Sequence, residues 1–100
     1  MNIHIALYKW KPSASAEELR RALEGIEGLA SLVPGIIEIV AKENRSKYSE
    51  GYTHVIFVRG KDQAAIDAYR AHPEHKRLAQ IIEGMEEQGV GVDFETGTSE

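Results

Sequence analysis

The sequence predicts an α+β fold in which a four-stranded antiparallel sheet carries helices on one of its faces. Three observations support this prediction. Four segments alternate in hydrophobicity or are rich in β-branched residues, which is typical of strands. Two longer regions repeat apolar residues at spacings of three and four, which is typical of amphipathic helices. Together these segments follow the order β-α-β-β-α-β, which is the split-βαβ or ferredoxin-like arrangement.

The first strand is expected over residues 3–10 and ends at Lys11-Pro12-Ser13. Because consecutive side chains of a strand point to opposite faces, one face carries Ile3, Ile5 and Leu7, and the other carries His4, Ala6, Tyr8 and Trp10. Both faces are largely apolar, so we expect both to be covered.

The first helix begins at Ser15-Ala16-Glu17-Glu18, which has the form of a capping box. Its apolar stripe consists of Leu19, Leu23, Ile26, Leu29 and Leu32. Pro34-Gly35 ends the helix, because proline and glycine together terminate helical structure.

The second half of the chain repeats this pattern. A strand is expected from Ile36 to about Ala41, followed by a polar loop and a strand over 52–58 that places Tyr52, His54, Ile56 and Val58 on one face. Asp62 is a plausible cap for a short helix that carries Ala65, Ile66 and Tyr69.

His72-Pro73 interrupts this helix and begins another, since proline suits the first turn of a helix and disfavours helical geometry in the residue before it. The inward stripe of the new helix consists of His75, Leu78, Ile82 and Met85. The last strand covers about 89–94. We expect one domain over residues 1–100, with a core of about 3–95 and a tail of 96–100.

Composition narrows the range of functions. One hundred residues with an apolar fraction of 42% are typical of one globular domain. The chain has no cysteine, so it has neither disulfides nor a thiolate site. The net charge is −4 and basic residues do not cluster on one face, so we expect no nucleic-acid partner. There is no signal peptide and no apolar run of about 20 residues, so we expect a cytoplasmic protein with no membrane contact.

The helices are expected on the face of the sheet that carries His4 and His54. The opposite face is then left with a large apolar patch, formed by Ile3, Ile5, Leu7, Val55, Phe57, Val90 and Val92. Such a patch on a monomer would be exposed to water. We therefore predict a homodimer in which the two sheets face each other.

Several phrases in a fixed order make the chain resemble the stress-responsive A/B barrel domain family, which consists of dimeric α+β barrels. The phrases are His4 to Lys11, Val33-Pro34-Gly35-Ile36, Asn44 to His54, Ala68-Tyr69-Arg70-Ala71-His72-Pro73-Glu74-His75, and Val92-Asp93-Phe94. The resemblance covers about residues 3–95 and implies a dimeric α/β barrel.

A plant polyketide cyclase of this family catalyses an aldol reaction between its sheet and helices. The resemblance implies that its catalytic tyrosine and histidine correspond to Tyr69 and His75, and that its strand histidines correspond to His4 and His54. The aromatic residues of its first helix are largely absent here, where Leu19, Arg20, Leu23 and Glu24 stand instead.

The residues themselves also predict a pocket between sheet and helices. His4, Ala6, His54 and Ile56 share the inward strand face, and Gly89, Gly91 and Asp93 share that face on the last strand. If the pocket is catalytic, neutral His75 serves as general base, because histidine has a pKa of roughly 6.5. Tyr69 then donates a hydrogen bond to a carbonyl oxygen.

Structural roles remain open for the same residues. His72 would cap the helix that begins at Pro73, His4 and His54 would bind backbone groups, and Tyr69 would be a core residue. Tyr8 and Trp10 are expected in interface or rim packing rather than in substrate stacking.

Three functional hypotheses follow. The first is a small-molecule lyase or cyclase that acts on a β-keto or polyketide-like substrate. The second is a non-catalytic, stress-associated homodimer that binds small apolar ligands, and the third is a monooxygenase of the related barrels. We expect no cofactor. A weakly held ion such as Mg²⁺ near the dimer interface is an alternative for which the sequence shows no ligand set.

Overall fold

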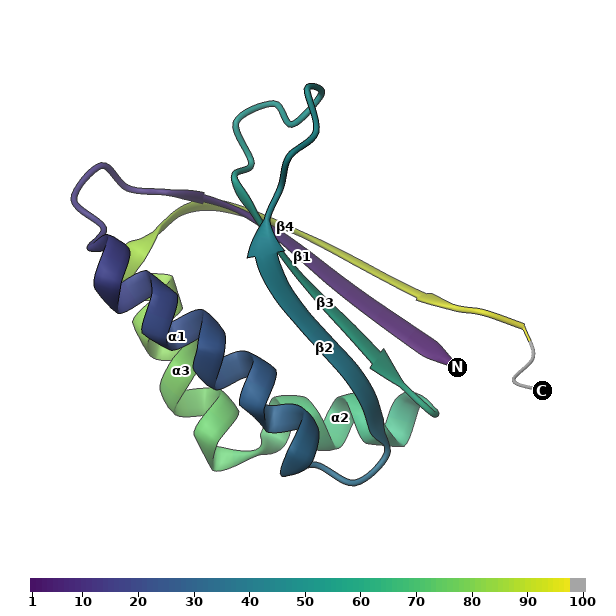
Figure 1. Ribbon diagram of the computed structural model, residues 1–100. Helices are drawn as coiled ribbons and strands as arrows, with labels where there is room; N and C mark the ends of the chain where they lie inside the picture. The colour runs from purple at the N-terminus through teal and green to yellow at the C-terminus, as the bar shows by residue number, and fades with distance from the viewer. Residues whose placement is uncertain (98–100) are drawn as a thin grey trace.

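A four-stranded antiparallel sheet packs against a layer of helices in the computed structural model, which describes residues 1–97 (Figure 1). This is the predicted ferredoxin-like fold. Its elements are β1 (Asn2–Trp10), α1 (Ala16–Gly28), a short 3₁₀ helix (Leu29–Ser31), β2 (Ile36–Glu43), β3 (His54–Gly60), α2 (Gln63–Ala71), α3 (Pro73–Met85) and β4 (Glu86–Glu95). Within the expected tail of 96–100, residues 98–100 lie outside the described part.

The strands lie in the order β2-β3-β1-β4, with antiparallel pairing throughout. His4 pairs with Val58 on one side and with Asp93 on the other. His54 pairs with Tyr8, four residues further along β1. This register separates the two strand histidines along the length of the sheet.

Side-chain caps begin all three α-helices. Ser15 Oγ accepts a hydrogen bond from the amide of Glu18 at 3.2 Å, and Asp62 Oδ1 accepts one from the amide of Ala65 at 2.9 Å. His72 Nδ1 accepts from the amide of Glu74 at 3.0 Å, and Pro73 follows as the first helical residue. The expected capping role of His72 is confirmed. His72 also ends α2, so the two helices meet at this turn.

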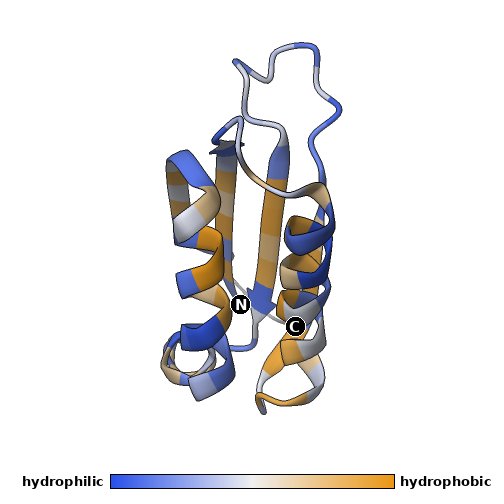
Figure 2. Cartoon of the chain, turned by 90° about the vertical axis from the view of Figure 1, so that its left-hand side faces the viewer, coloured by the Kyte–Doolittle hydropathy of each residue, from blue (hydrophilic) through white to orange (hydrophobic). Residues whose placement is uncertain are grey.

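The core lies between the helices and the sheet face that carries His4 and His54, as predicted. Ile56 and Val58 of β3 and Leu29 after α1 are almost fully buried there. The helices contribute stripes of buried residues, which are Leu19, Ala22, Leu23 and Ile26 of α1, Ala65, Ile66 and Tyr69 of α2, and Leu78, Ile82 and Met85 of α3. Figure 2 shows the corresponding bands of hydrophobic and hydrophilic residues along the chain.

Among the boundaries that differ from the sequence prediction are the end of α1 and the starts of β3 and β4. α1 ends at Gly28, and the tighter 3₁₀ winding that follows turns Leu32 outward, where it is 54% exposed, while Val33 is buried instead. β3 begins at His54 rather than at residue 52, because the Asn44 side chain binds the carbonyl of Tyr52 and holds the preceding residues in the loop. β4 begins at Glu86, directly after α3.

The outward face of the sheet is apolar. Val90, Val92 and Phe94 on the edge strand β4 are 41%, 43% and 47% exposed. They lie beside a half-buried group on the central strands, which consists of Ile5, Leu7, Val55 and Phe57. None of the helices within residues 1–97 is long and apolar enough to cross a membrane.

Replacement of Gly35 by alanine is expected to lower the free energy of unfolding by about 1–3 kcal/mol. Gly35 has a φ of +91°, and an added Cβ would lie 2.8 Å from the Cβ of Ala65. Gly84→Ala in α3 is the matched control, since its Cβ would meet no atom within 4 Å and alanine favours helices by up to about 1 kcal/mol. Urea unfolding of both variants measures the difference, and equal stability would contradict the expectation.

Candidate functional site

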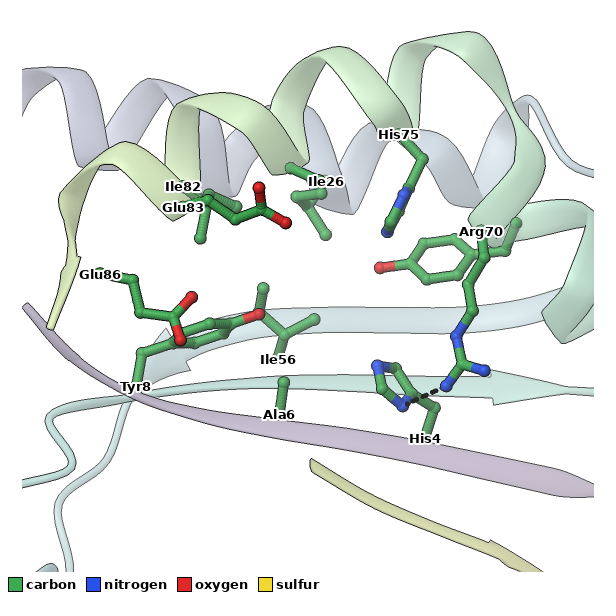
Figure 3. A pocket seen from close by; sticks show the side chains of 12 residues that line it. His4, Ala6, Tyr8, Ile26, Ile56, Arg70, His75, Ile82, Glu83 and Glu86 are labelled. Carbon is green, nitrogen blue, oxygen red and sulfur yellow. Dashed lines mark hydrogen bonds between the residues drawn. The ribbon is translucent and has the colours of Figure 1, made fainter. Parts of the chain in front are cut away.

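A cavity of about 270 Å³ lies between the sheet and the helices, and we call it the central cavity. Figure 3 shows its side chains pointing inward from both layers. Its walls are formed by His4, Ala6, Tyr8, Ile26, Ile56, Tyr69, Arg70, His75, Ala79, Ile82, Glu83 and Glu86. The apolar members occupy the middle, and polar groups gather at the two ends (Figure 3).

Three rings meet at one end of the central cavity. The ring centroids of Tyr69 and His75 are 4.5 Å apart, with an edge-on angle of 65° between the planes. The centroids of His4 and Tyr69 are 6.5 Å apart. Tyr69 lies in the last turn of α2 and His75 in the first turn of α3, so the turn capped by His72 brings the two side chains together. The structure thus places His4, Tyr69 and His75 in one cluster.

The hydroxyl of Tyr69 is available to a ligand. The residue is only 2% exposed, yet its hydroxyl has no hydrogen-bond partner within residues 1–97 while the side chain lines the cavity. Burial raises the pKa of Tyr69 well above its ordinary value, and the negative charge of an ionised Tyr8 would act in the same direction. The hydroxyl therefore keeps its proton at neutral pH and can donate a hydrogen bond.

The imidazole of His75 can accept a proton, whereas the Tyr69 hydroxyl donates a hydrogen bond. Burial lowers its pKa below 6.5, and the positive charges of His4, Arg70 and His72 lower it further. His75 is therefore neutral at pH 7, when one of its ring nitrogens carries a lone pair. A hydrogen-bond donor and a proton acceptor thus stand side by side at this end of the cavity.

His4 is held by two charged neighbours. Its Nδ1 lies 2.7 Å from Asp93 Oδ1 and 3.0 Å from Arg70 Nη2. Arginine only donates hydrogen bonds and an ionised carboxylate only accepts them, so Nδ1 can serve one of the two at a time. The shorter contact favours Nδ1–H donating to Asp93, and this bond lowers the pKa of the Asp93 carboxyl. Nε2 of a neutral His4 then carries the lone pair.

The other end of the central cavity is acidic and was missed by sequence reasoning. Glu83 and Glu86 extend toward Tyr8 there (Figure 3). Burial and the negative charges of Glu86 and Glu83 raise the pKa of Tyr8. The spacing of Glu83 from His75 was the available signal, since residues 75, 79 and 83 follow one flank of α3 at helical intervals, and Glu86 follows the helix as the first residue of β4. Tyr8, expected in rim packing, is a cavity wall and stacks on Trp10 with centroids 5.0 Å apart.

His54 does not join the cluster, and the prediction that it would is wrong. Trp10 Nε1 donates to His54 Nδ1 at 2.9 Å, and Thr53 Oγ1 lies 3.0 Å from the same nitrogen. The side chain lines a second hollow, about 410 Å³ in volume, between α1 and strands β2 and β3. Burial lowers the pKa of His54, and Glu43 opposes this effect. The pairing of His54 with Tyr8 causes the separation from His4.

The remaining predicted pocket residues fall into two groups. Ala6 and Ile56 line the central cavity as expected. Asp93 lies beside the cavity rather than in its wall and acts through His4 and Arg70, with 60% of its side chain exposed. Within residues 1–97 no group of three or more histidine, cysteine or acidic residues is arranged to hold a metal ion.

Comparisons with known proteins agree with this architecture. The family model described as the stress responsive A/B barrel domain matches residues 3–96. A stress-response A/B barrel domain-containing protein of Arabidopsis thaliana is 26% identical over 77 residues, which make up 77% of this chain and 29% of that protein. The chain thus spans less than a third of the length of this curated relative.

Solved structures show the same fold. A dimeric ferredoxin-like protein of unknown function from Jannaschia sp. CCS1 is 26% identical with a TM-score of 0.86, and the match covers 95% of this chain and 98% of that chain. The hydroxynitrile lyase of Passiflora edulis is 15% identical with a TM-score of 0.83, covering 99% and 96%. At that identity the likeness to the lyase shows the fold alone.

Proposed function

The chain belongs to the stress-responsive A/B barrel domain family, and we propose that it is a small-molecule lyase or cyclase that acts by proton transfer beside a carbonyl group of a β-keto or polyketide-like substrate. The contact between Tyr69 and His75 carries this proposal. The pair presents a protonated phenol and a neutral imidazole to the same cavity.

In the proposed reaction, His75 removes a proton from the carbon next to the carbonyl. The electron pair of that C–H bond forms a C–C double bond, and negative charge develops on the carbonyl oxygen. The Tyr69 hydroxyl donates a hydrogen bond to this oxygen. In a cyclase the resulting enolate attacks a second carbonyl of the same molecule, whose oxygen then takes the proton back from His75.

The shape of the central cavity supports a small substrate. Its volume of about 270 Å³ lies just below the range of roughly 300–1,000 Å³ that is usual for ligand pockets. Ala6, Ile26 and Ile56 supply apolar walls between the polar ends. A hydroxynitrile lyase, that of Passiflora edulis, has the same fold.

Deuterium exchange tests the proton-transfer step without knowledge of the final product. Short 3-oxo acids, esters and amides are incubated with the protein in D₂O, and the loss of their α-proton signals is followed by NMR against buffer alone. The proposal predicts exchange faster than in buffer for at least one compound. Background rates for every compound, with a ligand that nonetheless binds in the central cavity, would instead favour a non-catalytic binding protein.

The pH dependence of this exchange is a further prediction. A general base works in its neutral form, so the rate rises with pH through the pKa of His75 and levels off above it. Because burial and nearby positive charge lower that pKa, half-maximal rate is expected below pH 6.5. The raised pKa of Tyr69 predicts no loss of rate up to about pH 10. A midpoint above 7 would assign the base to another group.

The same cavity also suits the alternative of a dimer that binds small apolar ligands without reaction. The observation in its favour is the apolar middle of the cavity, formed by Ala6, Ile26, Ile56, Ala79 and Ile82. This alternative predicts that Tyr69→Phe leaves ligand affinity unchanged or improves it. The catalytic proposal predicts that the same substitution greatly lowers the rate of α-proton exchange.

We propose in addition that two copies pair through the outward sheet face. Val90, Val92 and Phe94 are the exposed apolar residues that this pairing would cover. The protein from Jannaschia sp. CCS1, which shares the fold, is dimeric. The helices and the central cavity lie on the opposite side of the sheet, so each subunit would keep its own site.

A further inference from the structure

Arg70 places a positive charge beside the reacting groups of the central cavity. It follows Tyr69 at the end of α2, and its side chain is 40% exposed where it lines the cavity beside His4 (Figure 3). Within residues 1–97 its close polar contacts all use Nη2, which donates to the two Asp93 oxygens at 3.1 and 3.3 Å and lies 3.0 Å from His4 Nδ1 without donating to it. Nε and Nη1 therefore keep their donors for another partner.

Asp93 holds this guanidinium in place without saturating it. Its carboxylate sits on the edge strand with 60% of the side chain exposed, so water screens its charge more than it screens a charge inside the cavity. The positive charge of Arg70 still acts on the cavity, because it contributes to the lowered pKa of His75. The planar guanidinium keeps its positive charge and holds its remaining N–H donors in fixed directions, which suits hydrogen bonding to an incoming carboxylate.

The opposite end of the cavity repels anions. Glu83 and Glu86 line that end, and neither carboxylate has an ion-pair partner within residues 1–97. Both raise the pKa of Tyr8, so their negative charge reaches the cavity wall. A ligand with one negative group therefore has only one favourable orientation.

We propose that the central cavity selects a short 3-oxo monocarboxylate, whose carboxylate accepts a hydrogen bond from an N–H group of Arg70 that its contacts with Asp93 leave free, and whose keto oxygen meets the Tyr69 hydroxyl, which lines the cavity without a hydrogen-bond partner among residues 1–97. This inference deepens the proposed function and rests on it for the role of the keto group. Arg70 is then a specificity-determining residue, and Glu83 and Glu86 reject a second carboxylate at the far end.

Binding measurements on matched ligands test this inference separately from catalysis. Acetoacetate and acetoacetamide have the same number of heavy atoms and differ in charge, and 3-oxoglutarate adds a second carboxylate. Isothermal titration calorimetry is expected to show that the protein binds acetoacetate roughly ten- to hundredfold more tightly than acetoacetamide, which is the range for a charge-assisted hydrogen bond. Binding of 3-oxoglutarate is expected to be weaker than binding of acetoacetate.

Substitutions then test whether Arg70 causes the preference for the carboxylate ligand. Arg70→Gln is expected to remove the preference for acetoacetate over acetoacetamide, and Arg70→Lys to keep part of it. Arg77→Gln is the matched control, since Arg77 pairs with Glu74 on the exposed side of α3 outside the central cavity and the preference is expected to persist. The double variant Glu83→Gln/Glu86→Gln is expected to improve binding of 3-oxoglutarate.

The outcomes separate the two proposals. Deuterium exchange with no Arg70-dependent preference for the carboxylate would overturn this inference and leave the proposed function standing. An Arg70-dependent preference without any exchange would overturn the proposed function and leave the carboxylate subsite. Failure of the protein to bind either acetoacetate or acetoacetamide would also overturn the inference.

Discussion

Substitution of His75 by alanine is expected to slow enzyme-dependent α-proton exchange by about 10²–10⁴-fold, which is the usual contribution of a positioned general base. The half-buried imidazole leaves a void in the cavity wall when it is removed. Free imidazole is expected to restore part of the rate, and the restored rate is expected to follow the pKa of free imidazole rather than that of His75. NMR exchange rates with and without imidazole provide the measurement.

Tyr69→Phe removes only the hydroxyl and is expected to lower the same rate by about 10²–10³-fold, as does the loss of a single donor to a developing oxyanion. Tyr48→Phe is its control, because Tyr48 is 77% exposed in the loop between β2 and β3. Lys76→Ala is the control for His75, since Lys76 is exposed on the same helix and lies outside the cavity. Full activity of both the His75→Ala and the Tyr69→Phe variant would show that the assigned roles are wrong.

A charge on the outward sheet face is expected to convert a dimer into monomers. Val92→Glu places a carboxylate opposite Ile5 in the proposed interface. Because the two subunits are related by two-fold symmetry, the interface would contain two such carboxylates. An unpaired buried charge costs about 3 kcal/mol or more, so the dissociation constant is expected to rise by roughly a hundredfold or more. Sedimentation equilibrium across a concentration series measures the change.

Leu32→Glu is the matched control for this prediction. Leu32 is a similarly exposed apolar residue, but it lies in the turn after α1 rather than on the sheet. Its substitution is expected to leave the association state unchanged. A wild-type protein that stays monomeric at micromolar concentration, or a Val92→Glu variant that associates as tightly as wild type, would exclude pairing through this face.

The sequence predicts the faces of the strands well and their register poorly. Strict alternation places His4 and His54 on the inward face, and both are found there. Which residues of two strands lie opposite each other depends on the lengths of the turns and on the start of β3 at residue 54. Tertiary pairing sets that register, so the distance between His4 and His54 could not be deduced from periodicity.

The charged residues of the site could not be predicted from the sequence, for a different reason. Arg70, Glu83 and Glu86 are the types of residue that normally cover a solvated helix face. The helical spacing of Glu83 from His75 is a local signal, but it does not separate the few charged residues that turn toward a cavity from the many that do not. The Tyr69–His75 pair was predictable because the His72-Pro73 break is visible in the sequence and forces two helices to meet at that point.

The absence of a side chain at Gly89 has a consequence for how the ligand range of this fold can change. A Cβ at this position would lie 2.4 Å from Oε2 of Glu86, so alanine there would push the carboxylate away from its present place in the cavity. A single methyl group on an edge strand, far from the reacting rings, would thus move one of the two carboxylates of the acidic end and leave Glu83 in place. The polarity of the cavity depends in part on a backbone position that itself carries no chemistry, and substrate range can therefore diverge without any change to the catalytic pair.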